Sequence, residues 1–301
     1  MRVSKASKGF VFSFLAAILF GVIPLFVHLI GDLGIGVYML VFFKNLFSLP
    51  FLILFSHMFE KRRVFPIGRM PFLQCCLMSL AGAVVTIILL FSSYSLIGTA
   101  AATSLHFLYP VFILLIGVLV FKERITWSDA VCFTLCMLGV FCLYNSSGQN
   151  SLAGALMAIA SGFFWAVYSI LIEKTGITGK IGDFPFLFWL NGLSLIVVGP
   201  ICIATHEFTL RFPLQVYLYL IAFSVIDSVV PAAFYQAGIR LIGSRRAALI
   251  GTMEPVTSIL IGLAFLREPA LPRNIIGAAL ILLSSVLLVL FSKKEDPTAL
   301  R

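Results

Sequence analysis

Ten stretches of this sequence are each close to 20 residues long and almost wholly apolar. A helix needs roughly 20 apolar residues to cross the hydrocarbon core of a bilayer. None of the stretches has the apolar–polar alternation of a membrane β-barrel. We therefore predict an all-α integral membrane protein with ten transmembrane helices, at 9–30, 36–58, 70–94, 99–121, 127–145, 151–172, 183–205, 214–236, 245–266 and 273–292.

The composition agrees with lipid as the solvent of this chain. Hydrophobic residues make up 61% of it and charged residues only 11%, against roughly 25% charged residues in soluble domains. The net charge of +9 raises the alternative of nucleic acid. Because the basic residues stand in short clusters between apolar runs, as in cytoplasmic membrane loops, we predict the lipid bilayer as partner and no nucleic acid.

Metal, cofactor and nucleotide motifs are missing from the sequence. The six cysteines form no CxxC pair and lie in or near apolar segments, where cysteine behaves as a small apolar residue. GxxxxGK[ST] is absent as well, so nothing supports ATP as an energy source within this chain. Clustered motifs of membrane enzymes are also lacking, and we predict no metal, no cofactor and no enzyme activity.

Lysine and arginine set the expected orientation, because they concentrate in cytoplasmic loops. With the N-terminus inside, only Arg211, Arg267 and Arg273 fall in outer loops, and the first apolar run is expected to stay as an uncleaved span. This predicts a multi-pass protein of the cytoplasmic (inner) membrane with both termini cytoplasmic. The inner side then holds Arg2, Lys5, Lys8, Lys61, Arg62, Arg63, Arg69, Lys122, Arg124, Lys174, Lys180, Arg240, Arg245, Arg246, Lys293, Lys294 and Arg301.

The two halves of the chain repeat each other at an offset of 145 residues. Segments 94–123 and 239–268 are identical at ten of 30 positions without a gap, and the matches include glycine, proline and glutamate. The repeats are 1–146 and 147–295, followed by a cytoplasmic tail at 296–301. Five spans per repeat is an odd number, so the repeats would insert inverted, which gives two conformations of similar energy and a site near the midplane.

The chain resembles the drug/metabolite transporter superfamily, in particular its EamA branch. The resemblance is carried by LIGTAAATSLHFLYPVFILLIGVLVFKERIT and LIGSRRAALIGTMEPVTSILIGLAFLREPA. It implies a secondary-active transporter with a central cavity that exports a small-molecule substrate, such as amino acids or related amphipathic compounds, by alternating access, with proton coupling as an option. The alternative is an uptake or exchange carrier for a cofactor or activated metabolite, of the S-adenosylmethionine or nucleotide-sugar type. The chain would be a monomer or a homodimer.

Three charged side chains fall inside spans: Lys44, Asp227 and Glu254. Such charges are expensive in lipid unless paired or hydrated. Lys44 has no basic counterpart in the second repeat, where Trp189 takes its place. One interpretation pairs Lys44 with Asp227 or with Glu254, which leaves one carboxylate for water, a proton or a cationic substrate. We predict that Asp227 and Glu254 line the cavity.

Two spans carry small and polar residues along one face. In span 99–121 the face holds Thr99, Thr103, His106 and Pro110, and in span 245–266 it holds Gly251, Glu254, Ser258 and Gly262. Pro110 and Pro255 are predicted to kink these helices. We interpret both faces as cavity walls; close helix packing is the alternative. Tyr109 and Glu254 are equivalent at the 145 offset.

The remaining candidates are aromatic and amide side chains in other spans. Trp165 and Tyr168 could stack on a substrate or simply pack in the membrane, and Gln236 could bind substrate or bridge two helices. The substrate and proton pathway predicted from the sequence therefore comprises Lys44, Thr103, His106, Tyr109, Trp165, Tyr168, Asp227, Gln236 and Glu254.

Overall fold

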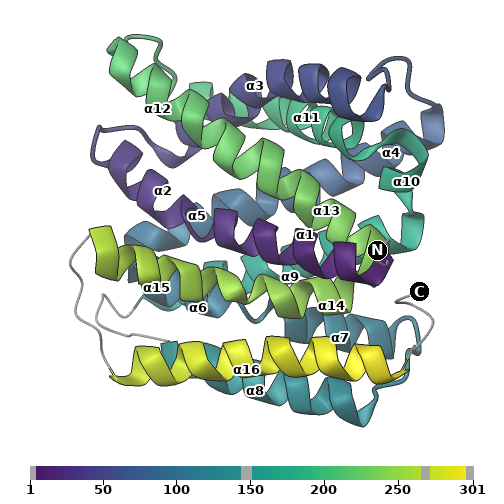
Figure 1. Cartoon of the computed structure of the whole chain (residues 1–301). Helices are drawn as coiled ribbons and strands as arrows, with labels where there is room; N and C mark the ends of the chain where they lie inside the picture. Colours follow the sequence, from purple (N-terminus) through teal and green to yellow (C-terminus); the bar gives the residue numbers. More distant parts are fainter. Residues whose placement is uncertain (1–4, 144–150, 266–271, 296–301) are drawn as a thin grey trace.

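A computed structural model describes residues 5–143, 151–265 and 272–295, and this part of the chain is helical with short connections (Figure 1). The first half contains α1 (Lys5–Phe20), α2 (Ile23–Gly31), α3 (Val37–Phe55), η1 (Ser56–Glu60), α4 (Arg69–Met78), η2 (Ser79–Thr86), α5 (Ile87–Ile97), α6 (Thr99–His106), α7 (Tyr109–Leu119) and α8 (Trp127–Leu143). The second half contains α9 (Leu152–Thr175), α10 (Ile177–Ile181), α11 (Asp183–Ala204), α12 (Leu214–Ser224), η3 (Val225–Val229), α13 (Val230–Ile242), α14 (Ser244–Gly251), α15 (Met253–Phe265) and α16 (Pro272–Glu295).

Seven continuous helical stretches are long and apolar enough to cross a membrane. They are Lys5–Gly31, Val37–Glu60, Arg69–Ile97, Ala101–Leu119, Leu152–Thr175, Asp183–Ala204 and Leu214–Ile242. Two shorter apolar helices, Trp127–Cys142 and Ile275–Phe291, accompany them. The remaining predicted span, 245–266, is divided between α14 and α15. The protein is thus a multi-pass, all-helical membrane protein, and the count of ten spans stays a prediction.

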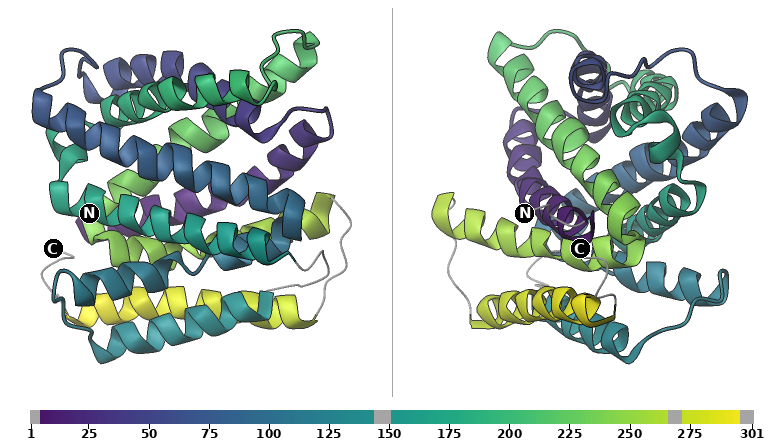
Figure 2. Two further views of the ribbon diagram at one scale, coloured as in Figure 1. Left: turned by 180° about the vertical axis from the view of Figure 1, so that it is seen from behind. Right: turned by 45° about the vertical axis from the view of Figure 1, so that its right-hand side comes forward.

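All the long helices run roughly along one direction, so the bundle has two ends. The start of α1 and the end of α16 lie at the same end, where α14 also begins (Figure 1). Figure 2 shows α8 and α16 side by side along one edge of the bundle, and these two helices form an extensive contact.

Helix contacts between the two halves come in exchanged pairs. Helix α1 packs along α13, and α5, which corresponds to α13 in the other half, packs along α9, which corresponds to α1. Helix α3 packs along α11, its own counterpart. The packing therefore repeats when the two halves are interchanged.

Individual side chains show the same exchange. A Cβ atom on Gly9 would meet Leu241 and Ile242, and one on Gly154 would meet the equivalent residues of the first half, Leu96 and Ile97. Each glycine lets its helix approach the other half closely, as small residues do between membrane helices.

Two asparagine–serine hydrogen bonds join α3 to α11 reciprocally, at an offset of 146 residues, one more than elsewhere. The Asn45 amide donates to the hydroxyl of Ser194 (2.8 Å), and the Asn191 amide donates to the hydroxyl of Ser48 (3.0 Å). All four side chains are buried. Asn45 and Asn191 therefore both bridge these two helices.

Candidate functional site

Two helices are interrupted just before a proline. The break between α6 and α7 precedes Pro110, and the break between α14 and α15 precedes Pro255. Pro110 has no N–H for the carbonyl of His106, four residues earlier. That carbonyl faces α9, where a Cβ atom on Gly162 would lie 2.5 Å from it. The glycine thus makes room for the backbone that the proline leaves irregular.

Two other helices contain a wider turn at matching positions. The π-helical segments η2 and η3 interrupt their helices at places that correspond through the 145 offset. Such insertions are frequent at functional sites. In η2 the Thr86 hydroxyl donates to the carbonyl of Ala81 (2.8 Å), and η3 carries Asp227.

A cavity lies between the halves, next to these irregular segments. It has an empty volume of about 620 Å³. Both halves contribute to its wall, which is mainly apolar and aromatic with a few polar groups. The lining residues are Ala17, Phe20, Ile23, Thr86, Ile87, Leu90, Phe91, Tyr94, His106, Tyr109, Trp165, Asp227, Tyr235, Gly251 and Glu254.

Lys44 and Asp227 form a buried ion pair beside the cavity. Lys44 Nζ lies 2.6 Å from Asp227 Oδ2, and the two side chains are only 4% and 7% exposed. Ser228 supports the pair, because its hydroxyl donates to Asp227 Oδ2 (2.8 Å) and accepts from Lys44 Nζ (3.2 Å). Of the two pairings considered from the sequence, the structure has Lys44 with Asp227. Asp227 lines the cavity, whereas Lys44 lies behind it.

Glu254 is the carboxylate left over by that pairing. It lines the cavity from the first turn of α15. Among the described residues, its side chain makes no hydrogen bond or ion pair. Since a charge in this setting requires water, a proton or a cation, the cavity offers one acidic site that the protein itself does not neutralise.

His106 has a defined tautomer. Its Nδ1 lies 2.8 Å from the hydroxyl of Ser161, and that hydroxyl lies 2.6 Å from the carbonyl of Ala158. A carbonyl can only accept, so the Ser161 proton goes to Ala158 and the hydroxyl accepts from His106 Nδ1. The neutral imidazole is therefore protonated at Nδ1, and Nε2 remains an acceptor.

Aromatic rings form a continuous wall of the cavity. Trp165 and Tyr235 are stacked with ring centroids 5.3 Å apart, and Phe20 meets both rings edge-on. The Tyr109 hydroxyl donates to the carbonyl of Ala248 (3.1 Å). Such faces attract cations and apolar groups alike.

The structure divides the residues predicted from the sequence into two sets. His106, Tyr109, Trp165, Asp227 and Glu254 come together around the cavity. The other four lie behind its wall. Thr103 contacts the Tyr94 hydroxyl at 3.5 Å, and the Gln236 amide donates to the Tyr168 hydroxyl (3.0 Å).

Sequence reasoning missed Tyr94 and Tyr235, which line the cavity. Tyr235 had no signal in the sequence, because its neighbour Gln236 faces another side of the helix and does not line the cavity. Several features singled out in the sequence lie outside the described residues: the side chains of Thr99 and Ser258, Arg267, and the tail at 296–301.

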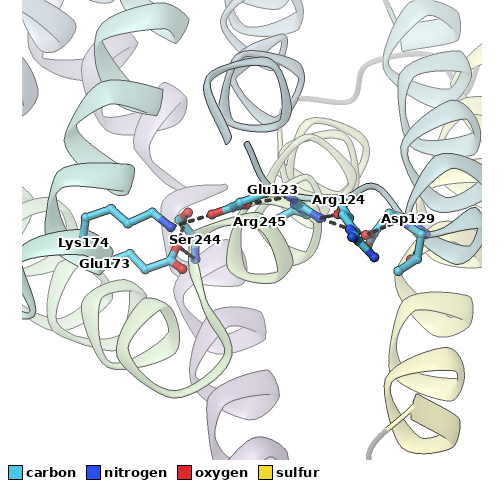
Figure 3. A network of polar contacts seen from close by, with 8 residues as sticks. Glu123, Arg124, Asp129, Glu173, Lys174, Ser244 and Arg245 are labelled. Carbon is cyan, nitrogen blue, oxygen red and sulfur yellow. Dashed lines mark hydrogen bonds and ion pairs between the residues drawn. The ribbon is translucent and has the colours of Figure 1, made fainter. Parts of the chain in front are cut away.

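One end of the bundle is joined by ion pairs between the halves (Figure 3). Glu123 accepts from Lys174 Nζ (2.5 Å) through Oε1 and from Arg245 Nη2 (2.7 Å) through Oε2. Arg245 also bonds Asp129 Oδ2 (2.9 Å). We call this the ion-pair end. The opposite end, the Glu207 end, has Glu207 accepting from the backbone N–H groups of Tyr38 (3.1 Å) and Met39 (3.3 Å).

Electrostatics keep Glu123 ionised. The hydrogen bond from Lys174, together with the positive charges of Lys174 and Arg245, lowers the pKa of the Glu123 carboxyl from its ordinary value of 4.5, against a smaller opposing effect of burial. Further bonds between the halves lie nearby: the Asp183 N–H donates to Glu60 Oε1 (2.8 Å), and Arg62 donates to the Lys180 carbonyl (2.8 Å).

The cavity belongs to the half of the bundle away from the ion-pair end. Lining residues from α1 begin at Ala17, and those from η2 and α5 run from Thr86 to Tyr94, the parts of these helices that lead towards the Glu207 end. Among the described residues, the cavity takes no lining residue from the beginning of α1 or the end of α9. The described part of the chain is therefore packed shut at the ion-pair end.

An apolar bundle that crosses the membrane, with a cavity shared between two similar halves, defines the class of multi-pass membrane transporters. The EamA-like transporter family model matches residues 7–145 and again 152–290. The chain belongs to the EamA-like transporter family.

Relatives named as transporters agree with this membership, and a solved structure has a similar fold. An uncharacterized transporter of Synechocystis is 28% identical over 67% of this chain and 62% of its own length. The uncharacterized inner membrane transporter YicL of Salmonella typhimurium is 25% identical over 86% of this chain and 87% of its own. A crystal structure that covers 96% of this chain and 99% of its own superposes with a TM-score of 0.75 at 16% identity, which is a likeness of fold.

Proposed function

We propose that this protein is a secondary-active transporter that exports small amphipathic metabolites, amino acids or related compounds, across the cytoplasmic membrane by alternating access. The observation that carries the proposal is Glu254: an acidic side chain without a protein partner among the described residues, in a cavity walled by both halves.

The charge of the cavity favours a cationic or zwitterionic substrate. Lys44 neutralises Asp227 (2.6 Å), so Glu254 supplies the remaining charge. A substrate ammonium group would pair with Glu254, and a proton could take its place in the absence of substrate. Trp165 and Tyr235 offer an apolar and cation-attracting surface for the rest of the molecule. These features suit a compound that has both an amine and an apolar portion.

Alternating access requires two conformations of similar energy, and the exchanged contacts support this. We infer ten spans arranged as two inverted repeats of five, 1–146 and 147–295, related by a twofold axis in the membrane plane. The reciprocal bonds Asn45–Ser194 and Asn191–Ser48 support an axis that passes between α3 and α11. Interchanging the two half conformations would then move the opening from one side of the membrane to the other.

The ion-pair end is proposed to be cytoplasmic. It carries Lys174, Arg240 and Arg245, in agreement with the bias of basic residues towards the inside. Because that end is packed shut, the structure would correspond to a conformation closed to the cytoplasm. Its ion pairs would hold this conformation and would have to separate during each cycle.

The test is a comparison of the metabolites inside and outside cells that overproduce the protein. Mass spectrometry of medium and cells would be run for the wild type, for Glu254→Gln and for Asp32→Asn, a change at an exposed carboxylate in the connection after α2. We expect a defined set of amines to accumulate outside with the wild type and Asp32→Asn only. Equal export by Glu254→Gln would refute the role of Glu254. Accumulation inside the cells would favour the alternative, an uptake or exchange carrier.

A further inference from the structure

Gln236 and Tyr168 are polar side chains buried in the closed part of the bundle. Gln236 is 0% exposed and Tyr168 is 2% exposed. The Gln236 Nε2 donates to the Tyr168 hydroxyl (3.0 Å), but Gln236 Oε1 has no hydrogen-bond partner. Turning the amide over would only move the deficit to Nε2, because among the described residues the Tyr168 hydroxyl is the partner that the Gln236 side chain contacts. A buried amide with an unused acceptor is unfavourable, and a conformation in which a donor reaches this oxygen would relieve the cost.

The pair adjoins the cavity but is separated from it by the aromatic wall. Tyr235, the neighbour of Gln236 in α13, lines the cavity. Trp165 lines the cavity too, and the centroid of its ring lies 5.0 Å from the ring centroid of Tyr168. One helical turn beyond Gln236, towards the ion-pair end, Arg240 bonds Asp183 (2.8 Å). Gln236 and Tyr168 therefore stand between the cavity and the ion-pair end.

The 145 offset shows what these residues would do in the opposite conformation. The counterparts of Tyr168 and Gln236 in the first half are Ile23 and Phe91, and both of these line the open cavity. In the opposite conformation, each half adopts the conformation that the other half has now. Each residue then takes the environment of its counterpart, so Tyr168 and Gln236 would become cavity residues.

Centrally placed residues serve as an internal check of this exchange. Phe20 and Trp165 are counterparts and both line the cavity, and the same holds for Tyr109 and Glu254. These residues lie near the inferred axis and would contact the cavity in either state. Ile23 and Phe91 lie off the axis, so they line it in the present state only.

We propose that Tyr168 and Gln236 form a second, state-dependent binding site, exposed when the transporter opens at the ion-pair end, that takes an N–H donor group of the substrate. The site rests on the proposed alternating-access function. The Gln236 carbonyl oxygen accepts from a substrate amine or amide, and the Tyr168 hydroxyl is the second polar contact. The equivalent positions of the present state, Ile23 and Phe91, are apolar.

Because of this difference, the two conformations bind the substrate with different affinities. Substrate that enters from the ion-pair end meets a polar amide acceptor as well as Glu254. After the exchange, Gln236 and Tyr168 are buried again, and the substrate faces Ile23 and Phe91 in their place. Binding is then weaker on the Glu207 side, in keeping with release at that side.

The test is cysteine accessibility from each side of the membrane. Single variants Gln236→Cys, Ile239→Cys, Phe91→Cys and Ala158→Cys of the full chain would be treated with a membrane-impermeant cationic methanethiosulfonate, in right-side-out and in inside-out vesicles. Ile239 is the counterpart of the lining residue Tyr94 and serves as a second probe of the site. Ala158 and its counterpart Ser13 are both buried at 0%, and neither lines the cavity. The unsubstituted protein gives the baseline of the six natural cysteines.

We expect Gln236→Cys and Ile239→Cys to react from the ion-pair side at least ~10 times faster than Ala158→Cys, and Phe91→Cys to react from the other side. If Phe91→Cys reacts while both other variants stay at the Ala158→Cys rate, the second site is refuted and the open cavity of the proposed function stands. If Gln236→Cys reacts from the Glu207 side only, the second site is refuted likewise. If Phe91→Cys and Gln236→Cys are both silent, the open cavity and the second site fail together.

Discussion

Lys44 Nζ and Asp227 Oδ2 lie 2.6 Å apart in the interior of the bundle, and Lys44 has no other carboxylate partner among the described residues. Removing one member would leave a buried, unpaired charge, which costs about 3–5 kcal/mol. We expect Lys44→Met to lower the melting temperature in detergent sharply and the double variant Lys44→Met/Asp227→Asn to recover most of that loss. Losses that simply add in the double variant would show that the two residues act independently.

Glu123 joins three elements at the ion-pair end, and its contribution depends on pH. Because Lys174 lowers the pKa of Glu123, its pairing is fully present above the ordinary pKa of 4.5 and is lost as the pH falls through the lowered value. We expect the melting temperatures of the wild type and Glu123→Gln to differ by a constant amount from pH 7 to about pH 5 and to converge at lower pH. A difference that already vanishes near neutral pH would contradict the pairing.

Gly162 lies where no Cβ atom fits. An alanine there would bring its Cβ to 2.5 Å from the His106 carbonyl oxygen, a backbone atom that cannot rotate away. We expect Gly162→Ala to destabilise the protein by about 1–3 kcal/mol. Gly31→Ala is the matched control, because a Cβ atom on Gly31 has no neighbour within 4 Å. The midpoint of thermal unfolding measures both, and equal midpoints would refute the close contact.

The two asparagine–serine bonds between α3 and α11 predict equal effects in the two halves. Side-chain hydrogen bonds between membrane helices contribute about 0.6 kcal/mol on average. We expect Asn45→Ala and Asn191→Ala to lower the stability by similar amounts, and the double variant to lower it by about their sum, because each asparagine bonds a different serine. A large effect from one variant alone would show that the two bonds are not equivalent.

Much of the architecture could be predicted from the sequence, because lipid imposes a simple rule on segment length and polarity. Apolar runs near 20 residues were sufficient to find the seven long membrane-capable helices. Pro110 and Pro255 indicated which helices would be irregular, because a proline removes a backbone hydrogen bond in the turn that precedes it. The shorter apolar helices near 127–142 and 275–291 leave the count of ten to experiment.

The candidate site was harder to predict. Residue type indicates which side chains could bind substrate or a proton, but it does not show which way each side chain points in the folded bundle. Helical spacing singled out His106, charge singled out Glu254 and the 145 offset added Tyr109, and all three line the cavity in the structure. Tyr235 was missed because the sequence does not show whether an aromatic residue in an apolar helix faces lipid, another helix or a cavity. Which carboxylate would pair with Lys44 depended on the place of η3 beside α3, a contact between segments far apart in the sequence.

The exchanged packing of α1 on α13 and of α5 on α9 has a consequence for biosynthesis. Helix α1 leaves the ribosome first, whereas α13, the helix that covers Gly9, is made only after most of the chain. At translation rates of about 5–20 residues per second, α1 waits on the order of ten seconds or more for its partner. During that interval lipid or the insertion machinery has to cover the face of α1 that α13 later occupies. The helices of the first half thus reach their packing partners only late in synthesis. A ribosome that stalls after the first repeat would leave these helices without their main partners.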